Sequence, residues 1–306
     1  MRSVQSLKNL LAPDAKARKV ASGFIRVEGP VWIPRLRSLR WSDLPRNRIF
    51  EYAPATKKIS IYRGSDNFVS GRNLDCDGDV VQCSHGNRRI ERNHNGQVER
   101  LADHYNGAHL NSPHNLVVTR NGNTWFTDPS FGIYIADEGH PGVQEYADSY
   151  VFRFDPRTER LIPVITDIEE PSGLAFSPDE GTLYVTDASA YLRTDGTGNR
   201  HIRAYDVKNG RCKNGRIFRA FEEGAPLGIR VDVGGNIWAC HSGGVEIISP
   251  EGKSLGKIEL PEPVSDLCFG GEDGSDLYMC ATSSIYHILT RTTDAARKTF
   301  SASETQ

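Results

Sequence analysis

Short runs of alternating apolar and polar residues, each followed by a turn, recur along most of the chain. Runs of this kind that are rich in Val, Ile, Tyr and Phe are typical of β-strands. The clearest of them occupy residues 39–43, 80–83, 124–128, 183–187, 237–240 and 277–280. Each has an apolar partner run just upstream, and turn residues such as Asn121-Gly122 separate the two. The pattern therefore predicts a series of β-hairpins.

The hairpins belong to a longer repeating unit. A third strand follows each hairpin, and a fourth closes most units, as at residues 98–101 and 161–164. The units begin at residues 28, 70, 114, 172, 227 and 265, a period close to the roughly 40 residues of a propeller blade. Six copies of a four-stranded antiparallel unit predict an all-β fold, a six-bladed β-propeller. A β-sandwich, or two smaller sandwiches, is the alternative.

The third and fourth units are longer than the others, which predicts long loops at residues 129–148 and 188–199. Both loops are polar and rich in Gly. Because binding residues commonly lie on loops, we expect these two to lie over one mouth of the central channel.

The repeats also set the domain boundaries. We expect an N-terminal extension at residues 1–16 with a helix near Ser6–Leu11, a single propeller domain at 17–291, and a loose polar tail at 292–306. Residues Ala17–Phe24 are expected to form the outer strand of the last blade and so close the ring. This organisation predicts little helix and more than about 35% strand, above the usual 20–25%.

Composition and charge narrow the class of protein. The chain carries 37 Lys and Arg against 39 Asp and Glu, a formal net charge of −2, which argues against a nucleic-acid or membrane partner. No run approaches the roughly 18 apolar residues of a membrane span. The N-terminus lacks the apolar block of a secretory signal, and the six cysteines form no CxxC pair. We therefore expect a cytoplasmic monomer or small homo-oligomer that acts on a small-molecule substrate.

In a propeller the first strand of each blade lines the channel, so the residues that open these strands face one mouth. In this chain they are Glu28, Ser70, His114, Ser172, Leu227 and Ser265. Most are polar, and groups from distant parts of the sequence that converge on one volume are what a site needs. We expect substrate to be bound there by Ser70, Arg72, Asn115, Leu227, Ser265 and Asp266, with His241 and Tyr191 reaching the mouth from nearby loops.

Several motifs together resemble one family. They are Glu28-Gly-Pro-Val-Trp32, Leu110–Val118, Trp125–Pro129, Pro171–Glu180, Gly228–Asp232 and Phe269-Gly-Gly271. In these the chain is similar to the regucalcin/gluconolactonase/luciferin-regenerating enzyme family, from about Leu10 to about Leu289. The resemblance implies a six-bladed propeller that hydrolyses lactones, with one divalent cation (Ca, Zn, Mg or Fe) at the channel mouth. It also implies that Glu28 is a ligand to that cation.

The sequence departs from the family pattern at the other metal positions. Ser172 stands where the family has an Asn ligand, Leu227 where it has an Asp ligand, and His114 where an Asn lies beside the metal. A leucine cannot ligate, and calcium or magnesium requires several oxygen donors. We therefore expect no tightly held cation, with Glu28 the one retained ligand if any metal binds.

These residues support three hypotheses. The first is a lactonase-like enzyme that acts on a small cyclic ester, with Glu28, His114 and Ser172 as catalytic residues. A Ser/His/Glu relay is one way in which they would act. The second is a metal-independent lyase, isomerase or cyclase that uses Glu28 and His114 as acid and base. The third is a propeller that binds a small molecule without catalysis.

One further run, Asp75-Cys-Asp-Gly-Asp79, resembles a fragment of a calcium-binding loop. It lacks the spaced ligands and the distal Glu of such loops. We interpret it as a hairpin turn.

Overall fold

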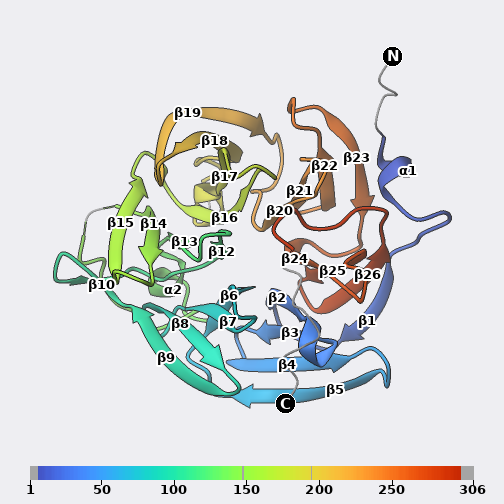
Figure 1. The fold of residues 1–306 in the computed structure, drawn as a ribbon, viewed down its shortest axis with the longest axis horizontal. Coiled ribbons are helices and arrows are strands. Elements are labelled where there is room, and N and C mark those ends of the chain that lie inside the picture. The colour runs from blue at the N-terminus through green and yellow to red at the C-terminus, as the bar shows by residue number, and fades with distance from the viewer. Residues whose placement is uncertain (1–5, 147, 194, 298–306) are drawn as a thin grey trace.

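The computed structural model describes residues 6–146, 148–193 and 195–297. Within them, six four-stranded antiparallel sheets stand around a central axis like the blades of a propeller (Figure 1). Strands make up 52% of the structure and helices 5%. The prediction of an all-β, six-bladed propeller is confirmed.

Each blade runs outward from an inner strand. Blade one contains β2 (Val27–Ile33), β3 (Ser38–Asp43), β4 (Arg48–Ala53) and β5 (Lys58–Gly64). Blade two contains β6 (Val69–Leu74), β7 (Val80–Ser84), β8 (Arg89–His94) and β9 (Gln97–Ala102). Blade three contains β12 (Leu116–Val118), β13 (Thr124–Asp128), β14 (Tyr150–Asp155) and β15 (Arg160–Ile165). Blade four contains β16 (Pro171–Phe176), β17 (Thr182–Asp187), β18 (His201–Lys208) and β19 (Arg211–Ala220). Blade five contains β20 (Ile229–Val231), β21 (Ile237–His241), β22 (Gly244–Ile248) and β23 (Ser254–Glu259).

Blade six joins the two ends of the chain. It contains β24 (Val264–Gly270), β25 (Asp276–Ala281) and β26 (Ser284–Leu289), and its outer strand is β1 (Arg18–Ser22). Since β1 pairs antiparallel with β26, the ring is closed by the N-terminal strand, as the sequence predicts. This arrangement also covers a strand edge that would otherwise stay unpaired.

The N-terminal extension packs on the propeller as well. Its helix α1 (Leu7–Leu10) lies against β23, and Leu10 joins the apolar cluster between blades five and six. The predicted helix near Ser6–Leu11 is therefore present. No helix of the described residues is long and apolar enough to cross a membrane.

Some elements were not predicted. They are the short helix α2 (Phe131–Tyr134), the 3-10 turns η1 (Pro34–Leu36) and η2 (Ser189–Tyr191), and the hairpin of β10 (His104–Tyr105) and β11 (Ala108–His109). Both α2 and η2 lie in the two long loops, whose positions the length of the repeats did predict.

The described part of the C-terminal segment differs from the loose tail that we expected. The Val233 amide donates to the Thr293 carbonyl at 2.9 Å, and the Ala295 amide donates to the Val231 carbonyl at 2.9 Å. Residues 295–297 also line a cavity of about 320 Å³ at the end of the channel opposite the mouth. Backbone pairing with β20, which apolar and polar patterning does not reveal, holds this segment in place. The rest of the expected tail, 298–306, lies outside the described residues.

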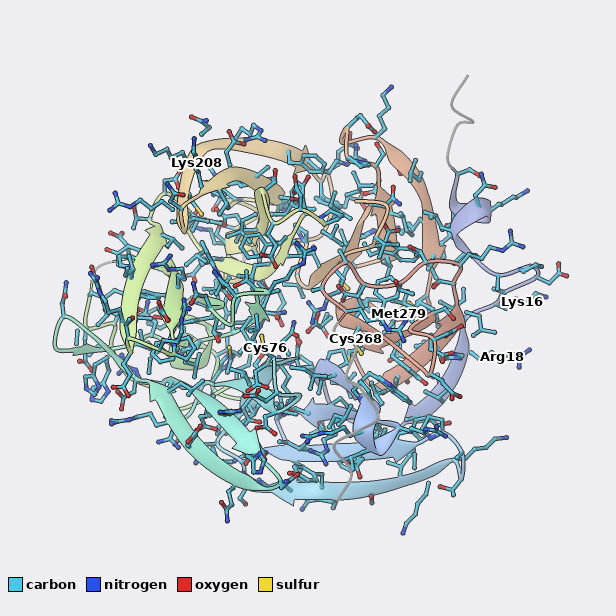
Figure 2. The ribbon with its side chains drawn as sticks, viewed as in Figure 1. Lys16, Arg18, Cys76, Lys208, Cys268 and Met279 are labelled. Atoms are coloured by element: carbon cyan, nitrogen blue, oxygen red, sulfur yellow. The ribbon has the colours of Figure 1, made fainter. Side chains whose placement is uncertain are left out.

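Apolar side chains fill the space between neighbouring blades. Trp41 and Trp238 are fully buried in two of these inter-blade clusters. At the rim of the propeller, the charged side chains of Lys16, Arg18 and Lys208 project outward (Figure 2). Met279 and Cys268 lie within blade six. Four cysteines, Cys83, Cys240, Cys268 and Cys280, are buried free thiols.

The innermost strands are joined by hydrogen bonds between blades. The Gly71 amide donates to the His114 carbonyl at 2.7 Å, and the Gly228 amide to the Ser265 carbonyl at 2.7 Å. Hydroxyl groups make the same kind of link: Thr127 Oγ1 donates to the Ser172 carbonyl at 2.7 Å. We call these contacts the inner ring. It places the residue that opens each inner strand next to its counterpart in the adjacent blade.

The inner ring requires glycine where two strands come closest. Gly173 follows the opening residue of blade four, and a Cβ atom there would lie 2.3 Å from the Leu227 carbonyl oxygen. At Gly29 it would lie 1.8 Å from the Ser70 carbonyl oxygen, and the φ of +56° is itself unfavourable for other residues.

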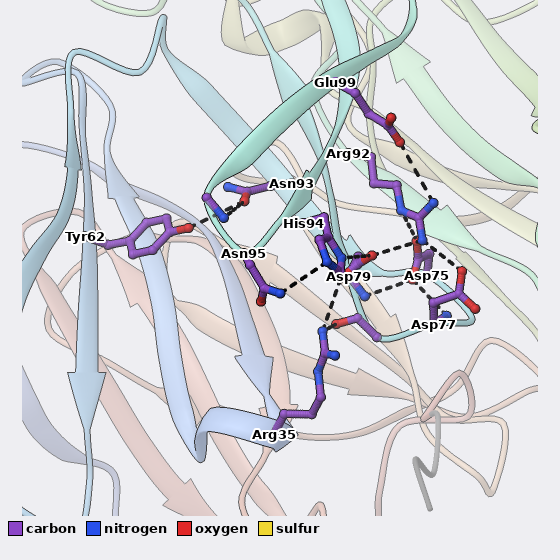
Figure 3. Close-up of polar contacts among 12 residues, drawn as sticks. Arg35, Tyr62, Asp75, Asp77, Asp79, Arg92, Asn93, His94, Asn95 and Glu99 are labelled. Atoms are coloured by element: carbon purple, nitrogen blue, oxygen red, sulfur yellow. Dashed lines mark hydrogen bonds and ion pairs between the residues drawn. The ribbon is translucent and has the colours of Figure 1, made fainter. Parts of the chain in front are cut away.

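The run Asp75–Asp79 is a hairpin turn between β6 and β7, as we interpreted it. The Asp75 amide donates to the Asp79 carbonyl at 2.9 Å. The Arg92 guanidinium lies among the three carboxylates, 2.8 Å from Asp75, 2.8 Å from Asp77 and 2.9 Å from Asp79 (Figure 3). An arginine side chain therefore neutralises the acidic groups that a calcium ion would require.

Glu262 links the strands that close the ring. Its carboxylate accepts hydrogen bonds from the Ser283 amide at 2.8 Å, from Tyr286 Oη at 3.1 Å and from Lys19 Nζ at 3.2 Å. Burial by itself would raise the pKa of Glu262, but the hydrogen bonds from Ser283, Ser284 and Lys19 lower it to about 2.

We expect Glu262→Gln to lower the free energy of unfolding by about 1.5–3 kcal/mol at pH 7, since it removes hydrogen bonds to a charged group. A depressed folded-state pKa stabilises the fold above the unfolded pKa near 4.5, and this contribution is lost as the pH falls toward about 2. The difference in the free energy of unfolding between Glu262→Gln and the wild type, measured by denaturant unfolding, should therefore be smaller at about pH 3 than at pH 7. Glu259→Gln, which changes an exposed carboxyl of β23, is the control and should alter stability by less than about 0.5 kcal/mol. An equal loss at both pH values would contradict this role of the carboxylate.

Candidate active site at the channel mouth

The residues predicted to open the inner strands lie at one end of the channel. Glu28 pairs with Ser42 near the end of β3, and the His114 amide donates to the Thr127 carbonyl near the end of β13. The second strand of each blade therefore ends at this mouth. The long loops that carry α2 and η2 begin there, as predicted.

Glu28 is buried at this mouth, with 7% of its surface exposed. Burial raises the pKa of its carboxyl to about 8; Asp266 and Glu138 add to the rise, while Arg26 and a hydrogen bond with Ser265 oppose it. At neutral pH the group is mostly protonated. It can therefore donate a proton rather than only attract a cation.

His114 has the opposite character. Burial lowers the pKa of its imidazole to about 4; a hydrogen bond with the Ser172 backbone opposes this shift, and Arg26 adds to it. Nδ1 is buried and has no hydrogen-bond partner among the described residues. In the tautomer that carries its proton on Nε2, this nitrogen is a free proton acceptor.

The His114 ring is fixed by two neighbours. It lies edge-on to Phe131 of α2, with ring centroids 5.2 Å apart, and next to the His85 ring at 5.4 Å. Burial lowers the pKa of His85 well below its usual value, so both rings are neutral at physiological pH.

Ser172 lies beside His114 but does not form a relay with it. Its Oγ is buried and, like His114 Nδ1, has no hydrogen-bond partner among the described residues. The two atoms are therefore not bonded to each other. Glu28 and His114 lie at the same mouth, where each interacts electrostatically with Arg26, and the Ser172 hydroxyl is available to bind a ligand.

Arg26 and Glu138 form an ion pair at the mouth that sequence analysis missed. Arg26 Nη2 lies 2.9 Å from Glu138 Oε1, and only 5% of the Glu138 side chain is exposed. Burial disfavours the charge on Arg26, but Glu138, Tyr191 and Glu28 favour it and raise its pKa. His85 Nδ1 lies 2.9 Å from the Glu138 backbone carbonyl and connects this pair to the two histidines.

Aromatic and aliphatic side chains cover one side of the mouth. Tyr191 of η2 is 44% exposed, and its ring lies 6.0 Å from that of Phe131. Tyr191 also interacts with Arg26, so it lies at the same mouth, and its role in binding substrate stays a prediction. The half-buried Leu227 is part of the same end of the channel.

The channel is closed just below the mouth. Asn115 Nδ2 donates to Asp266 Oδ2 at 3.4 Å, and both residues are almost fully buried. Ser265 Oγ donates to the Val27 carbonyl at 2.8 Å within the inner ring, and Ser70 is equally buried. These four predicted substrate-binding residues form the floor of the site rather than its open wall.

Two other predicted substrate-binding residues, Arg72 and His241, contact the propeller itself. Arg72 donates to the carbonyls of Gly29 at 2.9 Å and Ser70 at 3.1 Å, so it joins blades one and two. We therefore correct its role from binding substrate to holding the inner ring. His241 is the last residue of β21 and so lies at the mouth end of blade five, where its ring packs against Phe221 with ring centroids 5.8 Å apart.

The sequence carries only weak signals for the two residues that sequence analysis missed, Arg26 and Glu138. Arg26 stands two positions before Glu28, and Glu138 lies in a loop whose length was the one signal of function. Nothing in the spacing of the chain pairs Arg26 with Glu138, because loop conformation brings them together.

Comparison with known proteins shows the family and the fold of the chain. Residues 27–283 match the model of the family described as SMP-30/gluconolactonase/LRE-like region. The chain belongs to this family. A gluconolactonase of Zymomonas mobilis is 29% identical over 299 residues, which cover 89% of this chain and 81% of that protein.

Solved structures of the gluconolactonase family have the same fold. A gluconolactonase of Xanthomonas campestris is 32% identical with a TM-score of 0.86, covering 93% of this chain and 92% of that one. Regucalcin of Agrobacterium tumefaciens is 15% identical with a TM-score of 0.73, covering 94% and 96%, and shows the fold alone.

The residues at this mouth do not fit the divalent cation that the family resemblance implies. Leu227 offers no donor atom and Ser172 offers one hydroxyl, which leaves Glu28 as the retained carboxylate ligand. Glu138 is already paired with Arg26. Across the described residues, no group of three or more His, Cys, Asp or Glu side chains is placed to hold a metal ion.

We expect the purified protein to contain less than one equivalent of any divalent cation, and chelation to leave most of its activity intact. A hard cation needs several oxygen ligands, and this mouth provides too few. Elemental analysis together with assays with and without EDTA tests this. One equivalent of tightly held calcium, zinc or iron, with activity lost on its removal, would overturn the prediction.

Proposed function

We propose that this lactonase-like enzyme of the gluconolactonase family hydrolyses a small cyclic ester at the channel mouth without a divalent cation. The observation that supports the proposal is the presence of two buried groups at this mouth: the Glu28 carboxyl and a His114 imidazole whose Nδ1 has no partner among the described residues. Neutral imidazole accepts a proton from water, and a protonated carboxyl donates one to the leaving oxygen.

The two groups suit these roles because the site shifts their pKa values in opposite directions. Burial moves the pKa of Glu28 up to about 8 and that of His114 down to about 4, so each is uncharged at neutral pH. Paired groups whose environments separate their pKa values are typical of general acid–base catalysis. Ser172 Oγ, which has no partner among the described residues, is available to hydrogen-bond the substrate.

The same acid–base pair would also serve a lyase, isomerase or cyclase. Hydrolysis differs from these because water contributes an oxygen atom to the product. The floor formed by Asn115 and Asp266 favours a small substrate over a polymer that threads the channel. We further infer a cytoplasmic protein from the four buried free thiols, and a small-molecule substrate as its principal partner.

Turnover in H₂¹⁸O of a panel of five- and six-membered lactones is expected to place one ¹⁸O atom in the carboxyl group of each product, read by mass spectrometry. Lactone ring opening without ¹⁸O, or conversion of other substrates only, would support the lyase or isomerase reading. No turnover together with micromolar ligand binding would identify a binding propeller.

We expect kcat/KM to follow a bell-shaped pH profile with limbs near pH 4 and near pH 8. The acidic limb arises because His114 must lose its proton to act as a base, and the basic limb because Glu28 must keep its proton to act as an acid. Glu28→Gln and His114→Asn should each lower kcat about 10²- to 10⁴-fold, and each should abolish its own limb. Glu259→Gln serves as the unaffected control. A profile that both variants leave unchanged in shape would contradict this assignment.

A further inference from the structure

The Arg26 guanidinium interacts with both Glu138 and Glu28 at the mouth. We propose that its guanidinium, held by Glu138, takes the place of the divalent cation and stabilises the negative oxygen that forms on the lactone carbonyl. The proposal rests on the proposed lactone hydrolysis and adds to it the group that binds the reacting oxygen.

The backbone of Arg26 is fixed by blade one. Its amide donates to Asp43 Oδ1 at 3.3 Å, and its carbonyl accepts from the Leu44 amide at 2.9 Å. Arg26 therefore enters the mouth from the short link between β1 and β2, two positions before the Glu28 carboxyl.

The loop that carries Glu138 fixes the charged end of Arg26. His85 Nδ1 lies 2.9 Å from the Glu138 carbonyl. A Cβ atom at Gly132 would lie 2.7 Å from His85 Cβ, and one at Gly139 would lie 2.2 Å from the Gly132 carbonyl oxygen, so the loop packs closely on blade two. Residues from three blades thus set the position of the cation in advance, which is the condition for electrostatic stabilisation of a transition state.

The guanidinium retains donors for a ligand. Nη2 lies 2.9 Å from Glu138 Oε1 in the ion pair, yet neither Nη2 nor Nε, both buried, has a hydrogen-bond partner among the described residues. An arginine side chain has five N–H donors, and a buried donor without a partner is costly. An oxygen that becomes negative during the reaction provides the missing acceptor.

The resulting reaction balances. Water oxygen bonds to the carbonyl carbon while its proton passes to His114 Nδ1, and the π electron pair moves to the oxygen that faces Arg26. When this pair returns, the ring C–O bond breaks, and the leaving oxygen takes the proton of Glu28. The product is a hydroxy acid that contains all atoms of the lactone and of one water. His114 then returns its proton to Glu28 through solvent.

An arginine and a divalent cation exclude each other at this position. A metal ion bound by Glu28 would be repelled by the Arg26 charge and would find Leu227 where the family has a carboxylate. This yields a test that does not depend on activity. We expect calorimetric titration with CaCl₂ to show no binding to the wild type or to Leu227→Asp, and about one site in the double variant Arg26→Met/Leu227→Asp.

Chemical rescue tests the role of the guanidinium in turnover. Arg26→Ala should lower kcat about 10²- to 10³-fold with little change in KM, the usual effect of losing one stabilising donor. Guanidine hydrochloride, added well below denaturing concentrations, should raise the kcat of Arg26→Ala at least tenfold. Arg219→Met is the matched control, because it breaks a similar Arg–Glu pair at 2.8 Å between blades four and five, and guanidine should not change its activity.

Each outcome bears on the proposal. Calcium binding to the wild type or to Leu227→Asp would overturn it, as would failure of the double variant to bind calcium or failure of guanidine to rescue Arg26→Ala. The wild-type titration needs no variant and so does not depend on the folding of any. Lactone turnover that requires a bound metal would refute the role of Arg26 and leave lactone hydrolysis standing. Absence of lactone turnover would refute the proposed function, while the calcium titrations would still report whether Arg26 holds the cation position.

Discussion

The hydrogen bonds of the inner ring are the interaction on which the rest of this propeller depends. Each joins the opening residue of one inner strand to the neighbouring blade, through a backbone amide as at Gly71 or a hydroxyl as at Thr127. Because the contacts are this close, the residues at the tightest points are glycines. Side chains from six distant parts of the sequence are thereby held at one end of the channel.

The same closeness creates the electrostatics of the mouth. Few water molecules can reach a volume enclosed by six strands and two loops, so ionisation of Glu28 and His114 is disfavoured in both cases. A charged side chain is stabilised where it is paired with an opposite charge, as Arg26 is with Glu138. The site thus contains a neutral acid, a neutral base and one fixed cation. This differs from a metal centre, in which several anions surround an ion.

The sequence sufficed for the architecture because a propeller repeats. Six copies of one strand pattern fix the blade number, and the length of the third and fourth units locates the loops. Placing Glu28 and His114 at one mouth required only the register of the repeat. Arg72 was misread because its position in the repeat faces the channel, whereas its long side chain turns back onto the carbonyls of Gly29 and Ser70. The Arg26–Glu138 pair depends on loop conformation, and short-range patterns carry no information about it.

The hydrogen bond between Asn115 and Asp266 crosses the channel below the mouth and forms the floor of the site. The site therefore opens at one end only. Substrate and product must then pass through the same opening, beneath Tyr191. A molecule of product that has not departed blocks the entry of the next substrate, which makes departure a step that can limit turnover.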